Sequence, residues 1–221
     1  VVAVAELDPA RQAVAKADFN CDTYDDYKEF FKRDDIDLVV NSSYSDMHYP
    51  ITLDLLNHGF NVLCEKPVTK TADQLRELIA AAKANEPSNA SLYYVEGNIY
   101  NELRQAVKAD EENAEAKKQE YFDAALKAYE ECVKVNPEFE FGYIGKGIQY
   151  YNYAVELQDK ASNEFNQAKY EALLADMEKA LENALEPFEQ AYNVSKDNAL
   201  RVNVAEYLKN INYRFYSKGA E

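Results

Sequence analysis

An internal repeat in the C-terminal part constrains the fold of this chain more than any other feature. One set of residues returns at a fixed offset of 50, with Pro87, Tyr93, Gly97 and Tyr100 recurring as Pro137, Tyr143, Gly147 and Tyr150. A second set returns at an offset of 59, with Ala125, Tyr129 and Cys132 recurring as Ala184, Phe188 and Ala191. Small residues let two helices approach closely, and aromatic rings fill the seam between them. Repeats of this size therefore predict stacked helical hairpins, followed by a last helix over residues 198–216.

Residues 1–86 follow a different pattern, because short apolar runs alternate with amphipathic segments. Strands are expected over residues 1–6, 37–41 and 60–64, and helices over residues 9–17, 23–33, 48–57 and 71–85. This alternation implies parallel strands joined by right-handed crossovers. We therefore predict two domains, 1–86 and 87–221, and an α/β plus all-α fold class.

Composition excludes several classes of function. The chain has 24 basic and 40 acidic residues and a net charge of −16, which argues against binding to a nucleic-acid backbone. It has no apolar run long enough for a membrane-spanning helix and no sign of a signal peptide at its VVAVAELD start. Three cysteines without a C-x-x-C motif suggest neither a disulfide framework nor a metal site. The expected compartment is a reducing cytoplasm.

The stretch DLVVNSSYSDMHYPITLDLLNHGFNVLCEKP, residues 37–67, carries a recognisable motif. Its marker is Glu65-Lys66-Pro67 after a strand, with His48 opening the preceding helix. Residues 1–85 resemble the NAD(P)-binding domain of the glucose-fructose oxidoreductase, inositol dehydrogenase and MocA family of sugar and polyol dehydrogenases. The resemblance implies a Rossmann-like parallel sheet.

The same resemblance implies roles for individual side chains. Glu6 would accept a hydrogen bond from the adenosine ribose. Ser43 and His48 would lie beside the cofactor, Glu65 near the nicotinamide ribose, and Lys66 at the substrate hydroxyl as a catalytic lysine. The plainer interpretation is a solvent-exposed or structural Lys66 and a partly buried, polar His48. Tyr44 departs from the family, which usually has proline there.

The glycine-rich first turn of a dinucleotide fold is missing. Such a turn, G-x-G-x-x-G, brings backbone amides and a helix N-terminus to the pyrophosphate, whereas residues 1–58 contain no glycine. A helical segment also stands where the family has its second α/β domain. As the chain stands we therefore expect no cofactor, and NAD(P) only if missing residues supply the loop.

The repeat resembles tetratricopeptide repeats, with Tyr93-x2-Glu96-Gly97-x2-Tyr100 as its clearest copy. The family's concave groove would be lined by first-helix residues, namely Tyr94, Asn98, Asn101, Phe141, Ile144, Ile148 and Tyr151. Aromatic groups on such a surface suit an extended peptide or a partner helix. The alternative is that these side chains pack on neighbouring helices.

Two functions follow from these parts. The favoured hypothesis is a tetratricopeptide-like protein-interaction module joined to a truncated, inactive NAD(P)-binding-like region, as a chimera or a fragment. Its partner would be a basic or amphipathic protein or peptide. The alternative is an NAD(P)-dependent oxidoreductase of sugars or polyols, so whether the chain is an enzyme stays open. An unfinished parallel sheet also has exposed edges, through which the chain could self-associate.

Overall fold

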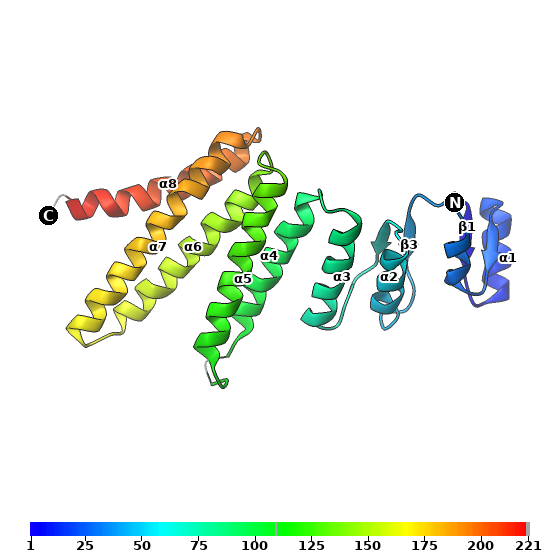
Figure 1. The fold of residues 1–221 in the computed structure, drawn as a ribbon, viewed down its shortest axis with the longest axis horizontal. Coiled ribbons are helices and arrows are strands. Elements are labelled where there is room, and N and C mark those ends of the chain that lie inside the picture. Colours follow the sequence, from blue (N-terminus) through cyan, green and yellow to red (C-terminus); the bar gives the residue numbers. More distant parts are fainter. Residues whose placement is uncertain (109, 220–221) are drawn as a thin grey trace. The chain divides into compact units, whose positions relative to one another are not determined.

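The computed structural model describes residues 1–108 and 110–219 (Figure 1). The chain divides into two compact units, Val1–Asn85 and Glu86–Glu221. We call them the α/β unit and the helical unit. Each is described by itself.

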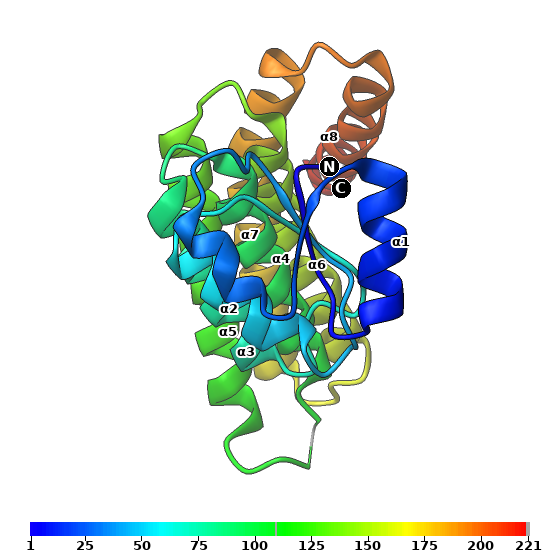
Figure 2. The same cartoon turned by 90° about the vertical axis from the view of Figure 1, so that its right-hand side faces the viewer.

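The α/β unit contains four short strands. In chain order its elements are β1 (Ala3–Ala5), α1 (Pro9–Phe19), β2 (Asp22–Tyr24), the 3₁₀ helix η1 (Tyr27–Lys32), β3 (Val39–Asn41), α2 (His48–Asn57), β4 (Val62–Cys64) and α3 (Ala72–Asn85). The strands form two separate parallel pairs, β1 with β2 and β3 with β4. Figure 2 shows α1 on one side of the first pair and η1 on the other. The unit is therefore a partial Rossmann-like domain.

One expected helix is replaced by a strand. The sequence predicted a helix over residues 23–33 with Thr23 as its N-cap, but Thr23 lies in β2 and pairs with Val4. The helical turn begins only after Asp26, whose carboxylate accepts from the amide of Lys28 at 2.9 Å. Asp-Thr-Tyr contains no apolar run, so its strand character comes from pairing with β1 and not from local preference.

The core of the α/β unit is small. Phe30, Val39 and Leu55 form its buried centre. In contrast, α1 has no buried residue. Val40 and Leu63, which face each other across β3 and β4, are 56% and 59% exposed. One face of this strand pair is therefore apolar and uncovered.

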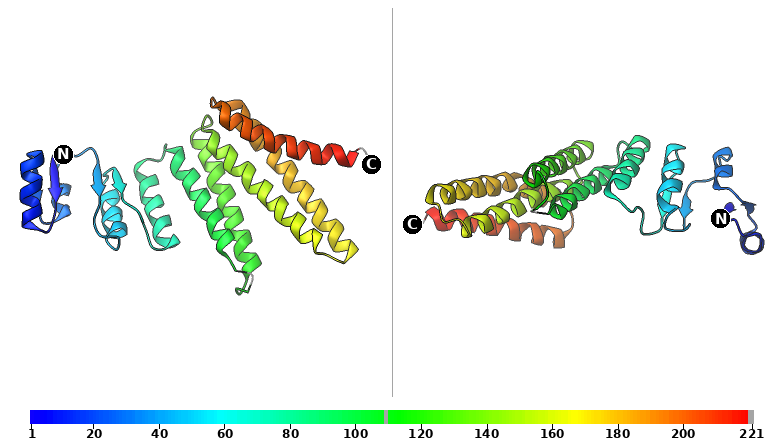
Figure 3. Two further views of the ribbon diagram at one scale, coloured as in Figure 1. Left: turned by 180° about the vertical axis from the view of Figure 1, so that it is seen from behind. Right: turned by 90° about the horizontal axis from the view of Figure 1, so that it is seen from below.

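The helical unit consists of α4 (Ala90–Ala106), α5 (Ala114–Val135), α6 (Glu140–Ser162), α7 (Gln167–Val194) and α8 (Asn198–Gly219). Figure 3 shows α4 with α5 and α6 with α7 as antiparallel hairpins, and α8 following α7. The residues that lengthen the repeat are mostly helical, since α6 has 23 residues and α7 has 28. Within the described residues, none of the helices is both long and apolar enough to cross a membrane.

Both hairpins use the same contact between glycine and an aromatic ring. A Cβ atom at Gly97 would run into the ring of Tyr129, and one at Gly147 would run into the ring of Phe188. Tyr129 and Phe188 are almost completely buried. The two glycines and the two rings are the residues that recur in the sequence. The repeat in sequence is therefore also a repeat in packing.

A charged pair joins the two hairpins. The guanidinium of Arg104 on α4 donates to both carboxylate oxygens of Glu156 on α6, at 2.6 and 2.5 Å. Its side chain is 7% exposed and lies over the rings of Phe122 and Tyr153. This bidentate geometry gives the hairpins a defined register as well as attraction.

Candidate functional site

The carboxyl ends of β3 and β4 carry most of the residues of interest. Asn41 pairs with Cys64 in register, and the carbonyl of Asn41 accepts from the amide of Glu65 at 3.0 Å. The residues that follow each strand therefore start from the same edge. In open α/β sheets, ligands bind in the crevice outside the carboxyl ends of the strands.

Asn41 organises the first loop. Its side chain is buried, and its Nδ2 donates to the carbonyl of His48 at 3.1 Å and to the Oγ1 of Thr52 at 3.0 Å. Its Oδ1 accepts from the hydroxyl of Ser43 at 2.7 Å. The buried amide is thus bonded on both sides, as a polar group inside a protein must be. It fixes the turn between β3 and α2.

His48 links this turn to the loop after β4. Its ring is 3% exposed, with Nε2 2.8 Å from the carbonyl oxygen of Ser43 and Nδ1 2.8 Å from the carbonyl oxygen of Pro67. Ser43 follows β3 and Pro67 follows β4. One imidazole therefore spans both loops.

Glu65 and Lys66 project from the second loop and are both exposed. Tyr44 and Met47, in the first loop, are exposed large side chains, and Tyr44 is 79% exposed. Within the described residues, Lys66 forms no ion pair. The structure therefore brings Ser43, His48, Glu65 and Lys66 to the carboxyl ends of one strand pair, with Lys66 exposed.

Glu6 lies at the end of the other strand pair. Its carboxylate accepts from the amide of Asp8 at 3.0 Å and lies 3.6 Å from the guanidinium of Arg11. The hydrogen bond from the amide of Asp8 lowers the pKa of Glu6 below its ordinary value, burial opposes this, and the charge of Arg11 lowers the pKa as well. Glu6 is therefore an anionic acceptor at the N-terminus of α1, apart from the four residues above.

Sequence reasoning missed Asn41 and Thr52. Asn41 closes an apolar strand, and Thr52 stands one helical turn after His48, so the signal was a polar pair flanking the motif. The sequence did not predict that the side chain of Asn41 hydrogen-bonds the turn before α2. The position of an asparagine at the end of an apolar strand does not reveal whether its side-chain amide is buried or exposed.

The described residues fit only part of a dinucleotide. Glu6 and the Ser43 loop offer polar groups of the kind that bind ribose hydroxyls. A diphosphate needs a glycine turn and free amides at a helix N-terminus, but the carboxylate of Asp8 already accepts from the amide of Ala10 in α1. The first glycine in the sequence is Gly59, which follows the end of α2 and has a φ of +83°. These residues therefore provide no diphosphate cradle.

In the helical unit, the predicted groove residues divide into two groups. Tyr94 packs against the rings of Tyr129, Phe139 and Phe141, and Asn98 accepts from the hydroxyl of Tyr129 at 2.8 Å. Tyr94, Asn98 and Phe141 therefore take part in packing. Asn101 is half-buried on α4.

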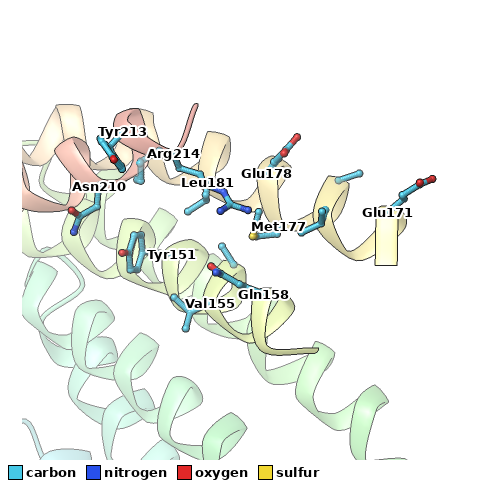
Figure 4. Close-up of a pocket in the computed structure, with 14 residues that line it drawn as sticks. Tyr151, Val155, Gln158, Glu171, Met177, Glu178, Leu181, Asn210, Tyr213 and Arg214 are labelled. Carbon is cyan, nitrogen blue, oxygen red and sulfur yellow. The ribbon is translucent and has the colours of Figure 1, made fainter. Parts of the chain in front are cut away.

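The second group lines hollows beside α8. Ile144 and Ile148 line one of about 390 Å³ with Val204 and Tyr207. Tyr151 lines a larger groove, of about 680 Å³, between α6, α7 and α8 (Figure 4). Its floor is apolar, with Met177, Leu181 and Ile211, and Glu171 and Glu178 stand along α7. Among the residues that the structure describes, no cluster of His, Cys, Asp or Glu could hold a metal ion.

Comparison with known proteins finds a family match for the N-terminal residues. Residues 1–91 match the model of an oxidoreductase family with an NAD-binding Rossmann fold, the family of glucose-fructose oxidoreductase, inositol dehydrogenase and MocA. This confirms the resemblance of the N-terminal part. The matched residues end at 91, so the tetratricopeptide resemblance gains no support from this comparison.

Similar proteins are dehydrogenases. The chain is 43% identical over 60 residues to trans-1,2-dihydrobenzene-1,2-diol dehydrogenase of Xenopus laevis, covering 27% of this chain and 18% of that protein. It is 36% identical over 87 residues to inositol 2-dehydrogenase of Burkholderia cenocepacia, covering 38% of this chain and 26% of that protein. The chain thus spans about a quarter or less of the relatives it matches. No solved structure matches it.

Proposed function

We propose that the α/β unit is the ribose-binding part of an NAD(P) site in an oxidoreductase of sugars or polyols. The observation that carries this proposal is the buried network of Asn41, His48 and Thr52. It holds Ser43 and the Glu65-Lys66-Pro67 loop together at the carboxyl ends of β3 and β4. The family match to residues 1–91 supports the cofactor class. The matched relatives are named for inositol and for a dihydrodiol, which supports a polyhydroxylated substrate.

Each exposed group has a role in this proposal. The carboxylate of Glu6 accepts from hydroxyls of the adenosine ribose, and its lowered pKa keeps it anionic at neutral pH. Glu65 and Ser43 bind near the second ribose. Lys66 places an ammonium group at the substrate hydroxyl, where it holds or accepts the proton that this hydroxyl exchanges.

The site needs one further strand and its glycine turn. The described strands form two separate parallel pairs, whereas a doubly wound sheet is continuous. A strand and glycine turn supplied by additional residues of the same protein would pair with both strand pairs and provide the diphosphate cradle.

Fluorescence titration with NADH and NADPH tests this proposal. The 221-residue chain is compared with one extended before Val1 by the strand, glycine turn and helix of an inositol 2-dehydrogenase. The control carries the same extension with its turn glycines replaced by valine. We expect the glycine form to bind at least about tenfold more tightly than the control, a difference of about 1.4 kcal/mol. Glu6→Ala should remove most of this gain. Equal binding by the two extended chains would contradict the proposal.

A second function is supported for the helical unit. We propose that it is a tetratricopeptide-like module that binds a basic, amphipathic helix or peptide. The shared contact of glycine with an aromatic ring supports the repeat. The apolar floor of the groove of about 680 Å³ supports an amphipathic ligand, and the net charge of −16 of the chain supports a basic one.

Matched surface variants test this second function. Val155 lines the groove and is 52% exposed, whereas Val202 on α8 is 60% exposed and does not line it. The probe is a labelled amphipathic helix of alternating leucine and lysine heptads, measured by fluorescence anisotropy. Val155→Glu should weaken its binding several-fold, and Val202→Glu should leave it within about twofold. Equal effects of both variants would mean that the groove is not the site.

A further inference from the structure

The side chain of Gln12 joins α1 to the ends of two strands. Its Nε2 donates to the carbonyl of Glu6 at 2.5 Å and to the carbonyl of Tyr24 at 3.3 Å. Glu6 directly follows β1, and Tyr24 is the last residue of β2. A side-chain amide carries two hydrogens on its nitrogen, so Gln12 can satisfy both carbonyls at once. We propose that Gln12 is a positioning residue for Glu6, which it holds in the orientation that receives the adenosine ribose.

Burial of apolar side chains does not hold α1 in this place. None of its residues is buried, and Val14 near its centre is 59% exposed. Near its C-terminal end, the Sγ of Cys21 lies 3.7 Å from the carbonyl oxygen of Ala15. Near its N-terminal end, the half-buried side chain of Gln12 bonds to the strand ends. Since leaving part-buried carbonyls without this donor is costly, the two bonds fix where α1 begins relative to β1 and β2.

Further hydrogen bonds connect Gln12 to the carboxylate of Glu6. The backbone amide of Gln12 donates to the carbonyl of Asp8 at 3.0 Å, and the amide of Asp8 donates to the Oε1 of Glu6 at 3.0 Å. Glu6 is thus bonded twice, by Gln12 at its carbonyl and by Asp8 at its carboxylate. These contacts fix the backbone and the side chain of Glu6 together.

The network leaves the second carboxylate oxygen of Glu6 for a ligand hydroxyl. Its Oε2 lies 3.6 Å from the guanidinium of Arg11, whose side chain is 71% exposed. A functional group recognises its ligand well when neighbouring bonds hold it in one geometry. Removal of the Gln12 bonds should therefore weaken contacts to the adenosine half of a dinucleotide. The nicotinamide half should keep its contacts, because the network at the ends of β3 and β4 does not include Gln12. This inference rests on the proposed nucleotide site.

A comparison of two ligands tests the inference. The extended, glycine-containing chain is titrated with NADH and with reduced nicotinamide mononucleotide, which lacks the adenosine half. Gln12→Met keeps the length of the side chain but cannot donate, and Lys16→Met places the same side chain at an exposed position of α1. We expect Gln12→Met to weaken NADH binding about fivefold and mononucleotide binding less than about twofold. Lys16→Met should leave both affinities within about twofold.

The outcomes separate this inference from the proposed function. Equal weakening of both ligands in Gln12→Met would show that Gln12 acts only through folding, and would overturn the inference alone. Unchanged NADH binding in this variant would also overturn it. If the parent chain binds NADH no better than its valine control, the proposed function is wrong, and the inference is wrong with it.

A measurement without ligand tests the positioning itself. In the 221-residue chain, nitrogen-15 NMR follows the backbone amide of Asp8, which donates to the carboxylate of Glu6. Glu6→Ala removes this acceptor and gives the shift of the unbonded amide. We expect Gln12→Met to move the Asp8 amide in the same direction, and Lys16→Met to leave it in place. An Asp8 amide that keeps its original shift in Gln12→Met would overturn the positioning role.

Discussion

The two units of this chain are held together in different ways. In the helical unit a continuous core runs through α6, α7 and α8, with Ala184, Phe188 and Ala191 fully buried. In the α/β unit the centre is Phe30, Val39 and Leu55, and no residue of α1 is buried. Helical hairpins bury their apolar faces against neighbours in sequence, whereas parallel strands need partners from distant segments. The helical unit thus buries a continuous core within itself, whereas the α/β unit leaves α1 without a buried residue and Val40 and Leu63 exposed.

Removing a central ring from each unit should have the largest effect. Phe188 is fully buried and stacks on Tyr207 with centroids 4.7 Å apart, so Phe188→Ala should cost about 3 to 5 kcal/mol of stability. Phe30→Ala should unfold the smaller unit. Circular dichroism melting reports the helices of both units, and the ring NMR signals of His48 and His58 report the α/β unit alone. A Phe188→Ala variant that also loses these histidine signals would contradict the separate cores of the two units.

Breaking the Arg104–Glu156 pair should have the next largest effect, confined to the helical unit. Glu156→Ala leaves a guanidinium that is 7% exposed without its carboxylate, and we expect a loss of about 3 kcal/mol. Arg104→Met keeps much of the packing on Phe122 and should cost about 1 kcal/mol. Urea unfolding measures both. A larger loss for Arg104→Met would show that the pair matters through packing and not charge.

Alkaline pH should weaken both units, and one tyrosine in each unit should contribute strongly to this loss of stability. Burial and the hydrogen bond to Asp54 raise the pKa of Tyr27 to about 12, and burial also raises the pKa of Tyr129. Because the folded state holds these protons longer than the unfolded state, stability is complete below pH about 10 and falls as the pH rises above it. Tyr27→Phe and Tyr129→Phe should each flatten this loss in their own unit, measured by melting at several pH values. An unchanged alkaline slope in both variants would contradict this.

Thiol reactivity should differ between the units without any change in fold. Burial raises the pKa of the Cys132 thiol to about 11, and its side chain is fully buried. Cys64, the last residue of β4, is partly exposed. Iodoacetamide followed by mass spectrometry should modify Cys64 at least about tenfold faster than Cys132. Comparable rates would mean that the helical unit opens more readily than its packing implies.

Local signals predicted much of this fold. A helix was expected over residues 48–57, and α2 spans His48–Asn57. Thr71 was expected to open the next helix, and its hydroxyl accepts from the amide of Gln74 at 3.3 Å. In both helices, residues within one helical turn set the helix end, so the sequence alone indicates where it lies.

Long-range contacts explain what could not be predicted. β2 forms because Thr23 pairs with Val4, and the sequence Asp-Thr-Tyr alone does not predict a strand. The bonds from Asn41 to Thr52 and from His48 to Pro67 join segments that fold together only after the strands pair. The motif therefore indicated two loops that the structure joins, but not the buried network that fixes them.

Hydrogen exchange tests most directly whether the ends of β3 and β4 form a nucleotide site. The extended, glycine-containing chain is incubated with saturating NADH, and exchange is followed by mass spectrometry. We predict slower exchange over residues 41–48 and 65–70, and no change over residues 90–215. Bound NADH that leaves both loops unchanged, or that protects the helical unit instead, would contradict the account.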